Sequence, residues 1–126
     1  MWYRLRAQKF VAVIGINKGH FHKNNNHENK EDIYLKWQSL SKKNYELKGI
    51  YVSANISEIK TIYHEKWGCP LGGEDTYEIS GICNPVFSDS NKWREVVLDI
   101  VKELKLYYEQ SSCSLEFCEC EFYYLT

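Results

Sequence analysis

Short apolar runs and apolar–polar alternation mark four stretches of the chain and predict four β-strands. Residues 10–16 form a continuous apolar run rich in β-branched side chains, as in a central strand that is apolar on both faces. Alternation just before this run, in residues 3–8, indicates that the strand begins early. Similar alternation predicts strands over residues 49–67, 76–83 and 113–125.

Two of these strands leave alternatives open. Residues 49–67 fit either one long strand or a tight hairpin around residues 55–57, and the absence of Gly, Pro or an Asn-Gly pair at this possible turn favours one long strand. In the last strand the apolar phase shifts by one residue at 117–118. Either a β-bulge or a strand that is apolar on both faces explains this shift.

Two stretches follow the helical period instead. Apolar residues recur at spacings of three and four in residues 30–45 and 91–109, which predicts two helices. Asp89, Ser90 or Asn91 can cap the second helix, because their side chains accept hydrogen bonds from its first N–H groups. Its wide apolar stripe consists of Trp93, Val96, Val97, Ile100, Val101, Leu104 and Tyr108.

The order of these elements predicts the fold. Strand, helix, strand, strand, helix, strand is the ferredoxin-like βαββαβ pattern. We therefore expect an α+β domain with a four-stranded antiparallel sheet and two helices on one face. A chain of 126 residues suits a single domain, residues 1–126. Both helices then cover the same face, and the other face of the sheet stays open.

The composition argues against several classes of protein. Lys and Arg number 16 against 17 Asp and Glu. Nucleic-acid-binding domains need a basic surplus to neutralise phosphates, so we expect no nucleic-acid partner. The first residues resemble no signal peptide, and no run reaches the ~18 apolar residues of a membrane span. We therefore expect a cytoplasmic protein without a membrane partner. Its five cysteines, odd in number and irregularly spaced, indicate reduced thiols.

Residues 64–75 form the best candidate site. Gly and Pro residues there give the strongest turn signal in the chain, next to an imidazole, a thiol, an indole and carboxylates. In one interpretation Cys69 is a nucleophile and His64 favours its thiolate, with Glu65 as a further catalytic candidate. In the other, the segment is a hairpin loop whose charges face water. The candidate ligand-binding residues are Trp67, Gly72, Gly73, Glu74 and Asp75.

Other potential ligands are weaker. His20, His22 and His27 lie close together, and imidazoles at close spacing suit zinc or nickel. No CxxC pair completes a structural zinc set, so we expect no metal or other cofactor. Cys118 and Cys120 share one face of the last strand, where core packing explains them better than a redox pair does.

Aromatic content suggests a use for the open sheet face. Phe, Trp and Tyr make up 15% of the chain, and such residues are enriched in interface cores. Our hypothesis is a small domain that forms a homo-oligomer through this face. It would bind a small molecule or protein there or at residues 64–75. A small enzyme that uses Cys69, or an inhibitor- or immunity-type protein, is the alternative.

Overall fold

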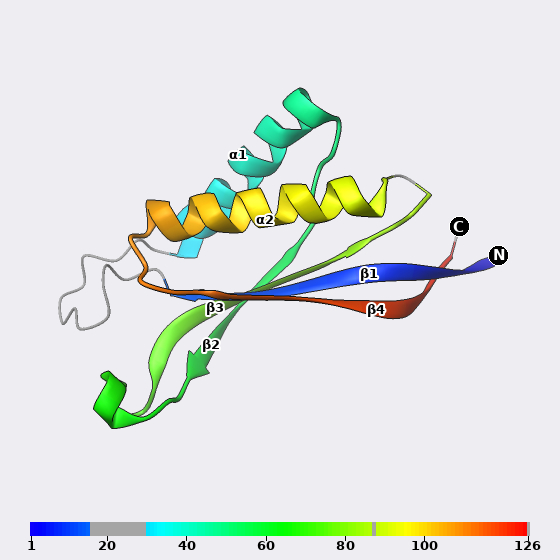
Figure 1. Cartoon of the computed structure of the whole chain (residues 1–126). Coiled ribbons are helices and arrows are strands. Elements are labelled where there is room, and N and C mark those ends of the chain that lie inside the picture. The colour runs from blue at the N-terminus through cyan, green and yellow to red at the C-terminus, as the bar shows by residue number, and fades with distance from the viewer. Residues whose placement is uncertain (16–29, 87, 126) are drawn as a thin grey trace.

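The computed structural model describes residues 1–15, 30–86 and 88–125, and it confirms the predicted fold. A four-stranded antiparallel sheet carries two helices on one face, in the order βαββαβ (Figure 1). We call the uncovered side of the sheet the open face. The elements are β1 (Trp2–Gly15), α1 (Lys30–Lys48), β2 (Asn55–Thr61), the short 3₁₀ helix η1 (Glu65–Trp67), β3 (Glu74–Cys83), α2 (Ser90–Tyr107) and β4 (Ser114–Leu125).

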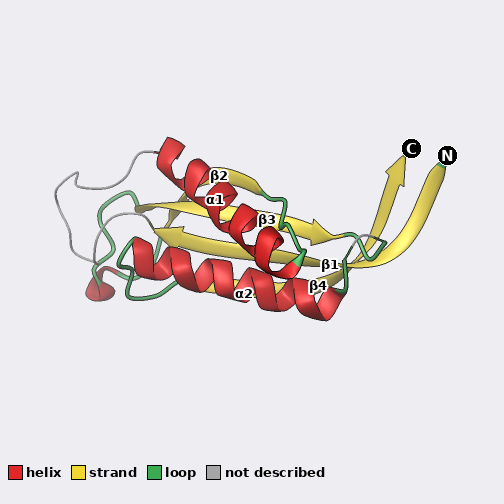
Figure 2. Ribbon diagram, turned by 90° about the horizontal axis from the view of Figure 1, so that it is seen from above, coloured by secondary structure: helices red, strands yellow, loops and turns green. Residues whose placement is uncertain are grey.

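The apolar strand β1 lies inside the sheet, whose strand order is β2-β3-β1-β4. From Gln8 to Gly15 it pairs with β3, and from Trp2 to Val13 it pairs with β4. Residues 2–7 therefore pair only with residues 120–125, and we call this two-stranded extension the terminal ribbon. Figure 2 shows it extending beyond the ends of the helices and curving, with both termini at its tip.

The core lies between the helices and the sheet. The Phe10 ring packs against two indoles, with centroids 5.8 Å from Trp37 and 5.7 Å from Trp93. Asp89, one of the three residues predicted as a cap, caps α2. Its side chain accepts hydrogen bonds from the backbone N–H groups of Asn91 and Lys92. The predicted apolar stripe of α2 is buried along its whole length: Trp93, Val96, Val97, Ile100, Val101, Leu104 and Tyr108.

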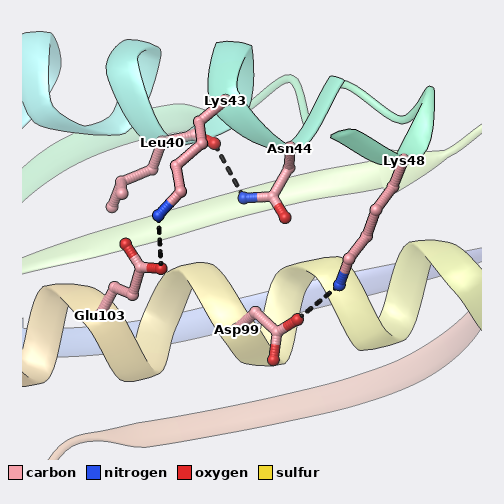
Figure 3. A network of polar contacts seen from close by, with 6 residues as sticks. All are labelled: Leu40, Lys43, Asn44, Lys48, Asp99 and Glu103. Carbon is pink, nitrogen blue, oxygen red and sulfur yellow. Dashed lines mark hydrogen bonds and ion pairs between the residues drawn. The ribbon is translucent and has the colours of Figure 1, made fainter. Parts of the chain in front are cut away.

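Ion pairs join the exposed edges of the two helices (Figure 3). Lys43 Nζ lies 3.3 Å from Glu103 Oε1, and Lys48 Nζ lies 2.9 Å from Asp99 Oδ2. The hydrogen bond to Asp99 and its charge raise the pKa of Lys48. Exposed pairs of this kind contribute little to stability, so the buried stripe holds the helices in place. In the described ranges, no helix is long and apolar enough to cross a membrane.

The strand predicted over residues 49–67 is too long. Only Asn55–Thr61 pairs with β3. Before it, the Val52 carbonyl accepts from Trp37 Nε1 at 2.9 Å and from Ser41 Oγ at 3.1 Å. Because α1 satisfies this carbonyl, the segment runs under the helix without forming a ladder, with Ile50 and Val52 buried.

The phase shift in β4 arises because the strand is apolar on both faces, and not from a β-bulge. The pairing with β1 runs without a break from Trp2↔Leu125 to Val13↔Ser114, so there is no bulge. Phe117 is partly buried against the core, whereas Phe122 belongs to the alternate set of side chains, on the open face. The first part of β4 is therefore apolar on the face that the helices cover. The part in the terminal ribbon is apolar on the open face.

Candidate functional site

A pocket lies on the open face, lined by residues of β1, β3, η1 and the start of β4. Figure 1 shows η1 and the start of β3 at the end of the sheet opposite the two termini. Its volume of about 430 Å³ falls within the roughly 300–1,000 Å³ of small-molecule sites. Among its lining residues in the described part of the chain, Glu74 is the only charged one. The lining consists of Val13 and Gly15 from β1, Thr61 and Tyr63 at the end of β2, Trp67 of η1, Glu74 and Thr76 of β3, and residues 110–114 before and into β4.

A tyrosine and a carboxylate form the polar centre of this pocket. The Tyr63 hydroxyl donates a hydrogen bond to Glu74 Oε1 over 2.8 Å. Burial, this hydrogen bond and the charge of Glu74 raise the pKa of Tyr63 to about 12. The phenol therefore stays protonated at neutral pH and keeps donating to the carboxylate.

The β1 backbone approaches Glu74 closely at Gly15. A Cβ atom at this position would lie 3.3 Å from Glu74 Oε2 and 2.7 Å from Gln110 Oε1. Any larger residue would displace one or both side chains. Glycine at this strand end thus leaves the second carboxylate oxygen, Oε2, room beside the pocket.

Two threonines give the pocket a neutral polar wall. The hydroxyls of Thr61 and Thr76 lie 2.7 Å apart, so one donates to the other. Thr76 Oγ1 also lies 3.4 Å from the Ile59 carbonyl oxygen, to which it can donate. Because these hydroxyls are both donors and acceptors, they suit hydrogen-bonding partners without a full charge.

The end of α2 brings Gln110 to the pocket. The N–H of Gln110 donates to the Lys105 carbonyl at 3.0 Å, and the N–H of Glu109 donates to the Leu106 carbonyl at 3.2 Å. This pair of bonds is a Schellman motif, with Glu109 in the left-handed region at φ 52°. The motif turns the chain sharply into residues 110–114, which form one wall of the pocket.

The catalytic candidates of the sequence lie around the pocket but are not joined to one another. His64 Nδ1 accepts from the Lys66 N–H at 3.0 Å and thereby caps η1. Cys69 Sγ instead accepts from the Tyr63 N–H at 3.4 Å. Within the described residues, no hydrogen bond links His64 to Cys69. Glu65 lies exposed in the first turn of η1.

The ligand-binding candidates divide into two groups. Trp67 and Glu74 line the pocket. Gly72 and Gly73 instead shape the turn before β3, where both have positive φ angles and the Gly73 N–H donates to the Pro70 carbonyl. Asp75 forms an ion pair with Lys60 on the neighbouring strand.

The histidines proposed for metal binding, His20, His22 and His27, lie outside the described residues. Within the described ranges, no group of three His, Cys, Asp or Glu residues could hold a metal ion.

Several residues that line the pocket were not among the candidates chosen from the sequence. Thr61 and Tyr63 share one side of an alternating stretch directly before the Gly-rich turn, which was the available signal. Gly15 and Gln110 gave no comparable signal, because only the tertiary fold brings them to Glu74.

One family model and two solved structures are similar to this chain. A family model described as SAM lyase matches residues 5–126. A solved phage SAM lyase in its apo state is similar in fold, with a TM-score of 0.67, 16% identity, and 96% of this chain and 90% of that chain covered. A phage SAM lyase in complex with S-methyl-5'-thioadenosine has a TM-score of 0.60 and 14% identity, with 95% and 90% covered. The search of curated proteins found no match.

Proposed function

This chain belongs to the SAM lyase family, whose model matches residues 5–126, and we propose on that premise that it cleaves S-adenosylmethionine in the Tyr63–Glu74 pocket. The observation that carries the proposal is the character of this pocket. It combines a ligand-sized volume, two aromatic side chains and a single carboxylate. S-Adenosylmethionine is a cationic molecule with a flat purine, and rings beside one negative charge suit such a ligand.

The bond to be broken follows from the ligand of a relative. One solved phage SAM lyase holds S-methyl-5'-thioadenosine, which retains the methyl and adenosyl groups of S-adenosylmethionine. We propose that this chain likewise breaks the bond between sulfur and Cγ of the amino-acid chain. The electron pair of that bond passes to sulfur, which loses its positive charge.

The amino-acid fragment can leave without water. In one route its carboxylate attacks Cγ, forms a five-membered lactone and transfers no proton. In the other, a base removes a proton from Cβ and an alkene forms. Within the described residues that line the pocket, no Lys or Arg would pair with the substrate carboxylate. A carboxylate held close to Cγ is a good internal nucleophile, and this route needs no separate base, so we favour the lactone route.

We propose that Glu74 binds the substrate's ammonium group. A carboxylate beside the sulfonium would stabilise a charge that disappears during cleavage, which stabilises the substrate more than the transition state. Beside the ammonium group it keeps its effect throughout the reaction and holds the chain in position. Tyr63 donates its hydrogen bond to Oε1 of Glu74, so Oε2 of Glu74, which lies near Gly15 and Gln110, is the oxygen proposed to bind the ammonium group. The exposed Trp67 ring at the rim is the proposed stacking surface for the purine.

Turnover of S-adenosylmethionine tests this function directly. The purified chain should form S-methyl-5'-thioadenosine and a lactone, separable by chromatography and identified by NMR. Glu74→Gln should lower kcat/KM about 100-fold, because an oriented charge is lost. Glu65→Gln, an exposed carboxylate of the same loop, is the matched control and should retain activity. Wild-type protein that forms no thioadenosine product above the spontaneous rate would contradict the proposal.

We also propose that the chain self-associates through the open-face side of the terminal ribbon. An isolated two-stranded ribbon is marginally stable in water, yet this one extends beyond the helices and β3. Its open-face side carries a stacked aromatic series, with ring centroids 5.3 Å apart for Tyr3 and Tyr124 and 5.9 Å for Phe122 and Tyr124. A second copy would give these rings a partner of the same chemistry.

Sedimentation would measure this association. The wild-type chain should have a mass well above the 14.9 kDa of one chain, and Tyr124→Glu should shift it towards the monomer. A monomer mass for the wild-type chain at micromolar concentrations would refute the association.

A further inference from the structure

The distance between Tyr63 and Glu74 depends on the loop that joins them. Tyr63 follows the end of β2, whereas Glu74 is the first residue of β3. Thr61 is the last residue of β2 to pair, and its partner is Glu74. Tyr63 therefore lies beyond the ladder, and contacts within the loop must hold its backbone.

Cys69 makes those contacts. Its sulfur accepts a hydrogen bond from the backbone N–H of Tyr63 at 3.4 Å. Its S–H group donates to the Pro70 carbonyl, also at 3.4 Å. The same carbonyl accepts from the N–H of Gly73, the residue before Glu74. One thiol thus connects the backbone of Tyr63 to the turn that leads into Glu74.

We propose that Cys69 is a positioning residue that aligns Tyr63 with Glu74. This inference rests on the proposed function of the pocket and gives the thiol a role other than that of a nucleophile. The S–H group is committed to a carbonyl, and His64 caps η1 through its Nδ1 atom. Loss of the thiol removes the hydrogen bond from the Tyr63 N–H and weakens the 2.8 Å hydrogen bond to Glu74.

The hydrogen-bonding capacity of the side chain separates this role from a reactive one. A serine hydroxyl both accepts and donates, whereas alanine does neither. Cys69→Ser should therefore retain most of the activity, and Cys69→Ala should lower kcat about tenfold, as expected when one aligning hydrogen bond is lost. Cys118→Ala removes an exposed thiol outside the pocket and serves as the control.

A second measurement follows Tyr63 without any turnover. In protein labelled at the tyrosine ring carbons, NMR titration should give Tyr63 its raised pKa of about 12 in the wild type, and Cys69→Ser should keep the part of the rise that comes from burial and Glu74. In Cys69→Ala this pKa should fall towards the ordinary value, and exchange of the Tyr63 amide proton should become faster. These readouts need only a folded chain, which the thermal unfolding midpoint checks.

The outcomes distinguish the two proposals. A lower Tyr63 pKa in Cys69→Ala, restored in Cys69→Ser, supports the positioning role even if the wild type forms no thioadenosine product. An unchanged Tyr63 pKa and unchanged amide exchange in Cys69→Ala would overturn it. Equal loss of turnover in the Ser and Ala variants, with Tyr63 unaffected in both, would also overturn it and indicate a reacting thiol.

Discussion

The two ends of β1 differ in the number of strands that pair with them and in their burial. Towards Gly15 the strand lies between β3 and β4, beneath the helices on one side and beside the pocket on the other. Towards Trp2 it pairs with β4 alone, and the charged ladder of Arg4–Glu121 and Arg6–Glu119 is exposed. The pocket is thus built where buried side chains fix the backbones of β1 and β3, and β3 begins with Glu74.

The largest difference between the two ends should be in stability. Phe10→Ala removes a fully buried ring and should lower the free energy of unfolding by about 3–5 kcal/mol. Tyr3→Ala truncates a partly exposed aromatic on the same strand and should cost about 1 kcal/mol. Urea unfolding at pH 7 measures both. Equal losses would show that the ribbon is as firmly packed as the core.

A smaller effect should follow from strain at the pocket wall. Glu109 has a left-handed backbone conformation, so Glu109→Val should cost about 1–2 kcal/mol. It should also raise KM, because Gln110 follows directly in the Schellman motif. Glu116→Val, on the exposed side of β4, suits a β-branched residue and is the control. A stable Glu109→Val variant with wild-type KM would show that the Schellman motif does not determine substrate binding in the pocket.

Alkaline pH should weaken the pocket end more than the ribbon. The pKa of Tyr63 and that of Tyr77 are raised to about 12 from 10.0. The stability they contribute is complete below pH 10 and is lost as the pH rises to about 12, because the unfolded chain ionises first. Tyr63→Phe should lose less stability than the wild type between pH 10 and 12. Parallel unfolding curves for the two proteins would contradict this assignment.

The smallest effect should come from the ribbon's charges. Arg6 Nη1 lies 3.5 Å from Glu119 Oε2, and both side chains are largely exposed. A double-mutant cycle with Arg6→Ala and Glu119→Ala should give a coupling of about 0–1 kcal/mol that decreases with added salt. A larger coupling that resists salt would show that these charges are buried, as in an interface.

The fold could be predicted because its signals are local. The apolar stripe of α2 and the alternation of β3 each lie within one short stretch, and their order specifies the topology. The length of β2 could not be predicted, because it depends on Trp37 of α1 bonding the Val52 carbonyl. Such a bond joins distant parts of the sequence and leaves no periodicity.

The candidate site was predicted in part for the same reason. Trp67 and Glu74 lie beside the Gly-rich turn and could be selected from the sequence. Tyr63 stood in an alternating stretch that was interpreted as strand. Gly15 and Gln110 come from opposite ends of the chain, and only the sheet order and the end of α2 bring them together.

The pairing of Trp2 with Leu125 constrains how the protein is made. On the ribosome, β1 emerges before β4, with α1, β2, β3 and α2 between them, so one edge of β1 lacks its neighbour until β4 has been made. An uncovered strand edge is a template for association with other chains. The ladder also joins residues that are far apart in the sequence, which makes it slow to form. Completion of the sheet is therefore a late event in folding, and translation rate and chaperones would act on the yield of active protein through it.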